Sequence, residues 1–291
     1  MEPETLKYDH DGAGALAYAE QAGEKMPIVF LHGSGFSKEV FKLQFAGQQL
    51  SDHHLIAVDL PGHGASDNAV DPKATYSYAG FASAVTDFIN WRGIERCIVV
   101  GWSLGGHIAY EMLDTVPQVA GVLAFGAPPA VGGPLGIIRS LHLSKNLLLI
   151  SKAKFSRADA ERFERACLDG RCEGEFIDAL CRTDEKMRPY LSRSVMGSTG
   201  HGQRKRVETT NTPVCLLQGR HDPIARTGYM QSFAGESLFA GRCIVFDESG
   251  HAPFLDASEK FDSLLSQFAD AVEADRSAAG GDIQPHYALA G

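Results

Sequence analysis

The chain has 291 residues, a length that suits one α/β domain carrying an insertion. Hydrophobic residues make up 44% and charged residues 22%, which is the balance of an ordinary globular protein and excludes a disordered chain. The net charge of −9 argues against a nucleic-acid partner, and no apolar run approaches the roughly 20 residues that a membrane span requires.

The first residues, MEPETLKYDHDG, are polar and hold no apolar core of a secretory signal, so a cytoplasmic location is expected. Six short runs farther along are rich in β-branched residues and end at turn residues, as strands buried on both faces do. These predicted strands span residues 27–31, 55–60, 97–100, 119–125, 213–218 and 242–246.

Helical periodicities lie between these runs. One apolar helix face holds Phe81, Val85, Phe88 and Ile89, and another follows Phe261, Leu264, Leu265, Phe268 and Val272. The alternation of strand and helix predicts an α/β fold, in which helices cover both faces of a mostly parallel sheet.

The alternation stops between residues 131 and 207, where helical patterns cover residues 135–150, 157–168 and 175–196. Ser156 is the predicted N-cap of the second helix, and Asp159 places a carboxylate in its first turn. An all-helical insertion between two strands predicts a cap over the carboxyl edge of the sheet. We therefore expect a core of residues 1–130 and 208–276, a cap of residues 131–207, and a flexible tail of residues 277–291.

A basic run and the spacing of the cysteines bear on partners, disulfides and metal binding. The basic run Arg204-Lys205-Arg206 is predicted to be a solvated loop, with a substrate or partner contact as the alternative. The cysteines form no CxxC pair and no Cys/His ladder, so neither a disulfide framework nor a metal site is expected. They are Cys97, Cys167, Cys172, Cys181, Cys215 and Cys243.

The sequence Gly101-Trp102-Ser103-Leu104-Gly105-Gly106 carries the strongest chemical signal. It follows a predicted strand and opens a helix, which is the context that a G-x-S-x-G nucleophile elbow requires. Glycines flank the serine because larger side chains would collide in so sharp a turn. Ser103 is therefore the predicted nucleophile.

A serine needs a base within hydrogen-bond reach. His251 follows the last predicted strand and precedes the final helix, so it lies at the same sheet edge as Ser103, and we predict that it is the base. Among the other histidines, His32 is expected to hold its loop together, His63 lies in a turn, and His107 is expected to be packed.

The base needs a carboxylate that orients it, and Asp222 directly follows the strand at 213–218. The loop after the strand at 119–125 offers no carboxylate, which strengthens this choice. Asp247 and Glu248 are close to His251 in sequence but are expected to face along the strand end. The order Ser103, Asp222, His251 is the order of this type of fold.

Acyl transfer also requires donors that face the developing oxyanion. The backbone N–H of Leu104, next to the nucleophile, is one predicted donor. The second is the backbone N–H of Ser34 in the His32-Gly33-Ser34-Gly35 loop, with Gly35 as the alternative.

The blocks described so far, together with the Asp59-Leu60-Pro61-Gly62-His63-Gly64 turn and Gly250-His251-Ala252-Pro253-Phe254, resemble those of α/β hydrolases in their order along residues 27–270. A closer resemblance, to the metal-independent N-acyl homoserine lactonases of that fold, extends to Tyr76-Ser77-Tyr78 and Pro128-Pro129. In three places the chain departs from that pattern. It has Ser34 for an asparagine, Asp222 for a glutamate, and Phe163 where the pattern carries a cap tyrosine.

The resemblance implies opening of a homoserine lactone ring by a serine triad, which would degrade a quorum signal, with the cap holding the acyl chain and without a metal or other cofactor. The expected partner is a small-molecule ester or lactone. A short-chain esterase, a C–C bond hydrolase and a non-catalytic receptor for a small ligand stay open as alternatives.

Overall fold

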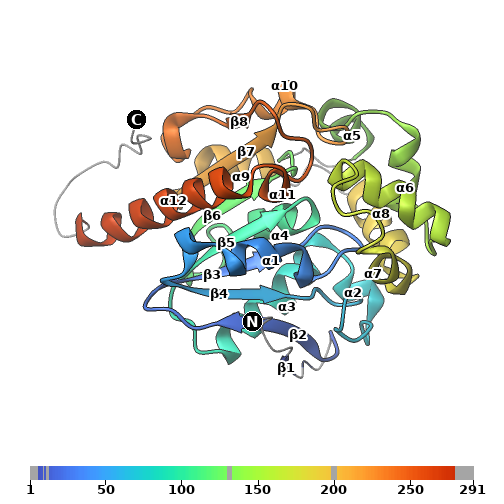
Figure 1. Cartoon of the computed structure of the whole chain (residues 1–291), viewed down its shortest axis with the longest axis horizontal. Coiled ribbons are helices and arrows are strands. Elements are labelled where there is room, and N and C mark those ends of the chain that lie inside the picture. Colours follow the sequence, from blue (N-terminus) through green and yellow to red (C-terminus); the bar gives the residue numbers. More distant parts are fainter. Residues whose placement is uncertain (1–5, 9, 11–12, 130–132, 198–201, 279–291) are drawn as a thin grey trace.

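The structure is a computed structural model that describes residues 6–8, 10, 13–129, 133–197 and 202–278. An eight-stranded sheet with the order β1-β2-β4-β3-β5-β6-β7-β8 forms its centre (Figure 1). The pairs β1–β2 and β2–β4 are antiparallel, and every other neighbouring pair is parallel. The strands are β1 (Leu6–Tyr8), β2 (Leu16–Gln21), β3 (Lys25–Leu31), β4 (His53–Val58), β5 (Cys97–Trp102), β6 (Val119–Phe125), β7 (Val214–Gly219) and β8 (Ile244–Phe246).

The six predicted strands are all present, with ends within two residues of the predicted ones, and the predicted fold class is confirmed. The strands β1 and β2 were not predicted. The sequence of β2, LAYAEQ, mixes apolar residues with alanine, glutamate and glutamine, which have low β-propensity. Pairing with β4 and burial of Tyr18 nevertheless hold it in the sheet.

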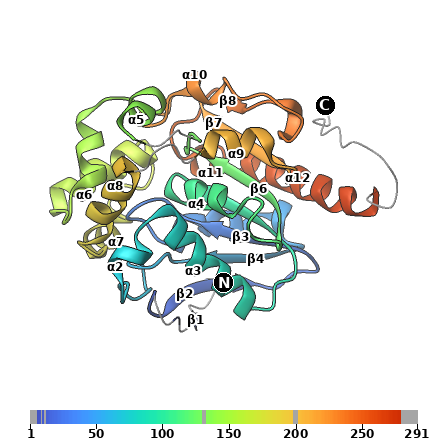
Figure 2. The same ribbon diagram turned by 180° about the vertical axis from the view of Figure 1, so that it is seen from behind.

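Helices cover both faces of the sheet. Figure 2 shows α3 (Tyr78–Trp91), α4 (Leu104–Met112) and α9 (Gln203–Thr209) on one face, and α1 (Lys42–Ala46) and α12 (Ser258–Ala278) cover the other (Figure 1). Successive residues of β5 alternate between the two cores, with Val99 packing toward α3 and α4 and Val100 toward α12. The α12 helix extends two residues into the predicted tail, and residues 279–291 lie outside the described part of the chain.

Among the described residues between β6 and β7 there are six helical segments, and we call residues 133–197 and 202–209 the insertion. They are α5 (Pro134–Ser140), η3 (Lys145–Ser151), α6 (Arg157–Leu168), α7 (Ile177–Arg182), α8 (Met187–Gly197) and α9. All except α9 gather at one end of the sheet (Figure 1). The remaining short helices are η1 (Lys38–Phe41), η2 (Gln48–Leu50), α2 (Pro72–Thr75), α10 (Thr227–Met230), η4 (Phe239–Gly241) and α11 (Pro253–Asp256).

The predicted helix at 157–168 is α6, and Ser156 caps it as expected. Its hydroxyl accepts from the Asp159 N–H (3.2 Å), while the Asp159 carboxylate accepts from the Ser156 N–H (2.8 Å). The other two predicted helices are each divided in two. Pro189 explains the second division, because a proline is tolerated in the first turn of α8 but would break a helix that continued from α7.

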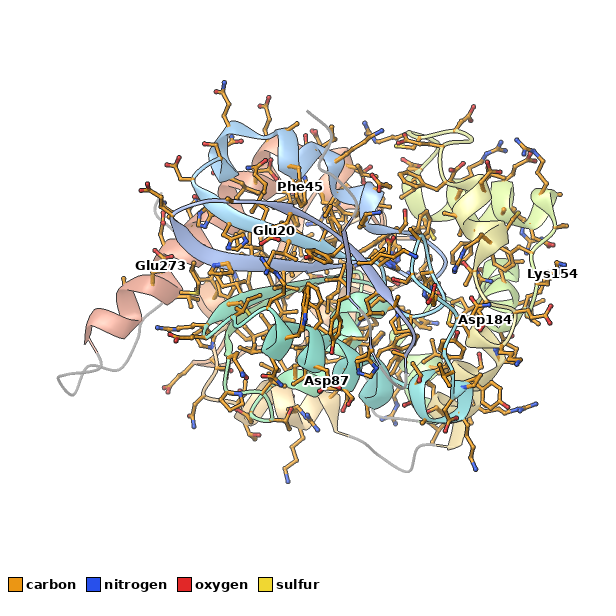
Figure 3. All side chains as sticks on the ribbon, turned by 90° about the horizontal axis from the view of Figure 1, so that it is seen from below. Glu20, Phe45, Asp87, Lys154, Asp184 and Glu273 are labelled. Carbon is orange, nitrogen blue, oxygen red and sulfur yellow. The ribbon has the colours of Figure 1, made fainter. Side chains whose placement is uncertain are left out.

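Asp184, between α7 and α8, attaches the insertion to the core. Its carboxylate accepts from the Tyr76 hydroxyl (2.5 Å), and its N–H donates to the Gly62 carbonyl (2.9 Å). Figure 3 shows Asp184 on the side of the insertion nearer the sheet and Lys154 farther out. Within the described ranges, no helix is long and apolar enough to cross a membrane.

Candidate active site

Ser103 lies at the sharp turn between β5 and α4. Its backbone has a φ of 51° and a ψ of −111°, a conformation that costs a non-glycine residue about 1–3 kcal/mol. The Ser103 N–H donates to the Phe125 carbonyl at 2.9 Å, which fixes the turn against the end of β6. The predicted elbow is therefore present, with Ser103 at its strained position.

The glycines of the elbow have no space for a side chain. A β-carbon at Gly105 would overlap the Leu31 carbonyl at the end of β3, and one at Gly106 would lie 2.5 Å from the Ala127 β-carbon. These close approaches place the first turn of α4 directly against the ends of β3 and β6. The same contacts would exclude larger residues at these positions.

His251 and Asp222 form a buried pair, with 2.8 Å between the imidazole Nδ1 and the carboxylate Oδ2. The Trp102 indole N–H donates to the His251 carbonyl at 2.9 Å. A β-carbon at Gly126, which follows β6, would lie 2.8 Å from the His251 Cε1. The imidazole thus lies beside the residues that end β5 and β6, which are also the residues that hold Ser103.

Four donors surround the Asp222 carboxylate. The N–H groups of Ile224 and Ala225 donate to Oδ1 at 2.7 and 2.9 Å, and the Gln218 amide donates to Oδ2 at 2.9 Å beside His251. Burial by itself would raise the pKa of the Asp222 carboxyl, but the charge of His251 and these hydrogen bonds hold that pKa below its usual value. An ionised Asp222 fixes the proton on His251 Nδ1, so Nε2 is the nitrogen that can accept a proton.

The loop after β3 lies against the elbow strand. The Phe36 N–H donates to the Gly33 carbonyl (3.1 Å), Gly35 has a φ of 85°, and a β-carbon at Gly33 would lie 3.0 Å from the Trp102 ring. Leu104 is the first residue of α4, and the first N–H groups of a helix have no partner within it. Both predicted oxyanion donors, at Ser34 and Leu104, therefore come from segments packed around Trp102.

Two other histidines weighed in the sequence, His32 and His107, have structural contacts. His32 interacts through Nδ1 with the Gly33 carbonyl (2.8 Å), and its Nε2 accepts from the Leu60 N–H (3.0 Å), so it links two loops as expected. Burial lowers the pKa of His32, which keeps the ring neutral. His107 stacks on Tyr78 with 4.7 Å between the ring centroids.

An aromatic cluster connects the elbow to the insertion. The Phe36 ring lies 4.8 Å from the Trp102 ring, 5.7 Å from Phe176 and 6.1 Å from Phe163, measured between centroids. Phe163 is buried and also meets Phe155 at 5.4 Å. The position that the lactonase resemblance gave to a tyrosine is thus an apolar wall in this chain.

The basic run is not a loop, which corrects the prediction, because these residues form part of α9. Arg204 pairs with Glu208 one turn away (2.8 Å), and Arg206 lies 3.6 Å from Glu111 of α4. The Arg204–Glu208 pair supports the helical conformation of α9, and the Arg206–Glu111 pair joins α9 to α4. Among the described residues, no group of three or more histidine, cysteine, aspartate or glutamate side chains is arranged to hold a metal ion.

One buried polar residue near the loop was not among the predicted site residues. Arg188 of α8 is fully buried, and its Nη2 lies 2.5 Å from the position of a β-carbon on Gly35. In the sequence, an arginine in the stretch Lys186-Met187-Arg188-Pro189 resembles the solvated face of a helix. Nothing in the local pattern indicated that the insertion would bury it.

Comparison with known proteins identifies hydrolases, one of which is named as an esterase. The model of the alpha/beta hydrolase family matches residues 28–263. The AB hydrolase superfamily protein YisY of Bacillus subtilis is 25% identical, over 87% of this chain and 95% of its own. A pimeloyl-[acyl-carrier protein] methyl ester esterase of Aliivibrio fischeri is 27% identical, over 86% and 96%.

Among solved structures, the N-acyl homoserine lactonase AidH, as a mutant complexed with N-hexanoyl homoserine lactone, aligns with a TM-score of 0.88. It is 30% identical, and the alignment covers 93% of this chain and 99% of that one. The predicted likeness to these lactonases is confirmed, and esterase and lactonase neighbours support an ester-acting hydrolase. The chain belongs to the alpha/beta hydrolase family.

Proposed function

We propose that this chain hydrolyses carboxylic esters or lactones through an acyl-enzyme on Ser103, and that ring opening of N-acyl homoserine lactones is its reaction. The observation that carries the proposal is the buried His251–Asp222 pair beside the strained elbow of Ser103. The likeness to a lactonase complexed with its lactone supports the choice of substrate.

In the proposed reaction, His251 Nε2 removes the Ser103 proton as the hydroxyl attacks the lactone carbonyl, and Asp222 stabilises the resulting imidazolium. The N–H groups of Leu104 and Ser34 donate to the oxyanion. Collapse of the tetrahedral intermediate breaks the ring C–O bond, and His251 protonates the leaving alkoxide. Water, deprotonated by His251, then releases the opened acid and restores the serine.

The leaving alcohol of a lactone stays attached to the acyl group, so hydrolysis of the acyl-enzyme must outpace ring closure. We propose that the insertion acts as a cap that holds the acyl chain and orders the opened product. The aromatic wall of Phe36, Phe155 and Phe163 is the apolar surface on which an acyl chain would lie.

The experiment is mass-resolved hydrolysis of N-acyl homoserine lactones of different acyl length, with EDTA present and Ser103→Ala as the control. The lactone should gain one water with the wild type at a rate at least about 10³-fold above that of the variant. Chelation should leave that rate unchanged. Equal rates for the two proteins would overturn the proposed mechanism.

A short-chain carboxylesterase is the second candidate, favoured by the similarity to the methyl ester esterase. The same assay with an aryl acetate separates the two. Cleavage of the aryl ester by the wild type, with every lactone left intact, would assign esterase activity and remove the lactonase claim.

A further inference from the structure

Arg188 carries a guanidinium that the protein does not satisfy. Its side chain is fully buried, yet Nε, Nη1 and Nη2 have no hydrogen-bond acceptor among the residues that the structure describes. The guanidinium makes a cation–π contact, since its carbon lies 3.8 Å from the Phe155 ring centroid. Buried polar groups in folded proteins normally have partners, so each such exception indicates a ligand or a function.

The position of the guanidinium places it at the candidate active site. Nη2 lies against Gly35, one residue from the proposed oxyanion donor Ser34. The Ser34 hydroxyl is itself buried without a hydrogen-bond partner in the described part of the chain, and so is His63 Nε2. Several polar atoms without partners thus gather beneath the insertion, next to the loop that would face the reacting carbonyl.

The charges around Arg188 do not neutralise it. Among ionisable groups, the thiols of Cys181 and Cys167 influence Arg188 most, and neither is a carboxylate. Burial lowers the pKa of Arg188 to about 10, so the side chain remains a cation at neutral pH. A buried charge without a partner is costly, and binding of an acceptor there would recover part of that cost.

We propose that Arg188 binds the substrate by donating hydrogen bonds to an oxygen of its acyl portion, outside the reacting ester. Two sources of that oxygen fit the chemistry: the amide carbonyl of an N-acyl homoserine lactone, or the carboxylate of a dicarboxylic half-ester. In the lactone, only the α-carbon and the amide nitrogen separate the amide carbonyl from the reacting carbonyl. The inference rests on ester hydrolysis at Ser103.

The test compares wild type and Arg188→Met on four substrates: N-hexanoyl homoserine lactone, an α-hexyl butyrolactone without an amide, an aryl hexanoate, and the monoaryl ester of glutaric acid. Loss of a hydrogen bond to a charged donor should lower kcat/KM by about 10- to 100-fold for the first or the last substrate. The loss should appear mainly in KM. The two substrates without the extra oxygen should change less than about 3-fold.

Two variants separate binding from structure. Arg193→Met removes another arginine of α8, which lies over Tyr190, and should leave all four rates unchanged. Arg188→Lys keeps the charge but not the planar fork, and should show the same selective loss if the methionine variant does not fold. Because Arg188 has no hydrogen-bond acceptor to lose within the described residues, its replacement by methionine should not lower the thermal unfolding midpoint.

Equal losses on all four substrates, or a lowered midpoint with no substrate selectivity, would overturn the proposal. Unchanged kinetics on all four would do the same. Selective loss on the glutarate ester, with no turnover of the lactone by the wild type, would uphold the role of Arg188 and remove the lactonase claim. Selective loss on the amide lactone would uphold both.

Discussion

Two carboxylates at the carboxyl edge of the sheet and one guanidinium of the insertion above it are all buried, but they differ in how far the protein supplies them with hydrogen bonds. At the sheet edge, the Asp59 carboxylate accepts from the Lys38 and Ala65 N–H groups at 2.6 and 2.8 Å, and Asp222 has four donors. In the insertion, the guanidinium of Arg188 has no acceptor within the described residues. The carboxylates are organised before any substrate arrives, whereas the guanidinium keeps the donors that the proposed substrate contact would use.

The largest effect is expected when the charge of the partnered Asp222 carboxylate is removed. Asp222→Asn should lower kcat on an aryl ester by about 10⁴-fold, because the neutral amide no longer fixes the His251 tautomer or stabilises the imidazolium. Asp247→Asn, at an exposed carboxylate four residues before His251 in the sequence, should leave kcat unchanged. Steady-state kinetics give kcat for the two variants. A similar loss of kcat in both would exclude Asp222 as the orienting acid.

The next largest expected effect is a loss of stability when the close packing of the elbow is disturbed. Gly105→Ala places a β-carbon on the Leu31 carbonyl and should lower the free energy of unfolding by about 3 kcal/mol. Gly228→Ala is the matched control, because a β-carbon there meets nothing within 4 Å. Urea unfolding gives the free energy of unfolding of each variant and of the wild type. An unchanged value for Gly105→Ala would show that α4 does not lie where the structure places it.

Asp262 is a buried carboxylate with fewer hydrogen-bond donors than Asp222, and the pKa of its carboxyl is shifted in the opposite direction. Asp262 accepts from the Gln44 amide at 3.1 Å, and burial raises the pKa of its carboxyl to about 6. The folded chain therefore holds a proton that the unfolded chain, with a pKa near 3.9, releases, so stability should fall as pH rises from about 4 to 6.

Asp262→Asn removes this ionisation and should raise the free energy of unfolding at pH 7 by about 2 kcal/mol relative to the wild type. The difference should vanish near pH 4, where the wild-type carboxyl is protonated. Urea unfolding at the two pH values measures it. A variant that is less stable than the wild type at pH 7 would contradict the raised pKa.

The fold was largely predictable because its signals are local. Buried parallel strands are continuous apolar runs, and the elbow requires glycines at fixed offsets from Ser103, so both appear in the sequence. The strand β2 was not predictable from periodicity, because it depends on pairing with β4. The break between α7 and α8 has a local signal in Pro189, which periodicity alone does not detect.

The candidate site likewise has a part that the sequence predicted and a part that it did not. The partners Ser103, Asp222 and His251 follow strands whose carboxyl ends meet at one edge, so strand order alone brings their loops together. Arg188 was missed because burial of an arginine is decided by how the insertion packs on the Gly35 loop. The sequence around Arg188 does not encode that contact.

Labelling with a fluorophosphonate, which phosphonylates activated serines, tests the central claim most directly. Peptide mass analysis should place the adduct on Ser103, with ester and lactone hydrolysis lost in proportion to labelling. The adduct should be absent from Ser103→Ala and strongly reduced in His251→Ala. An adduct on another residue, or full hydrolysis by a protein labelled at Ser103, would contradict an acyl-enzyme on this serine.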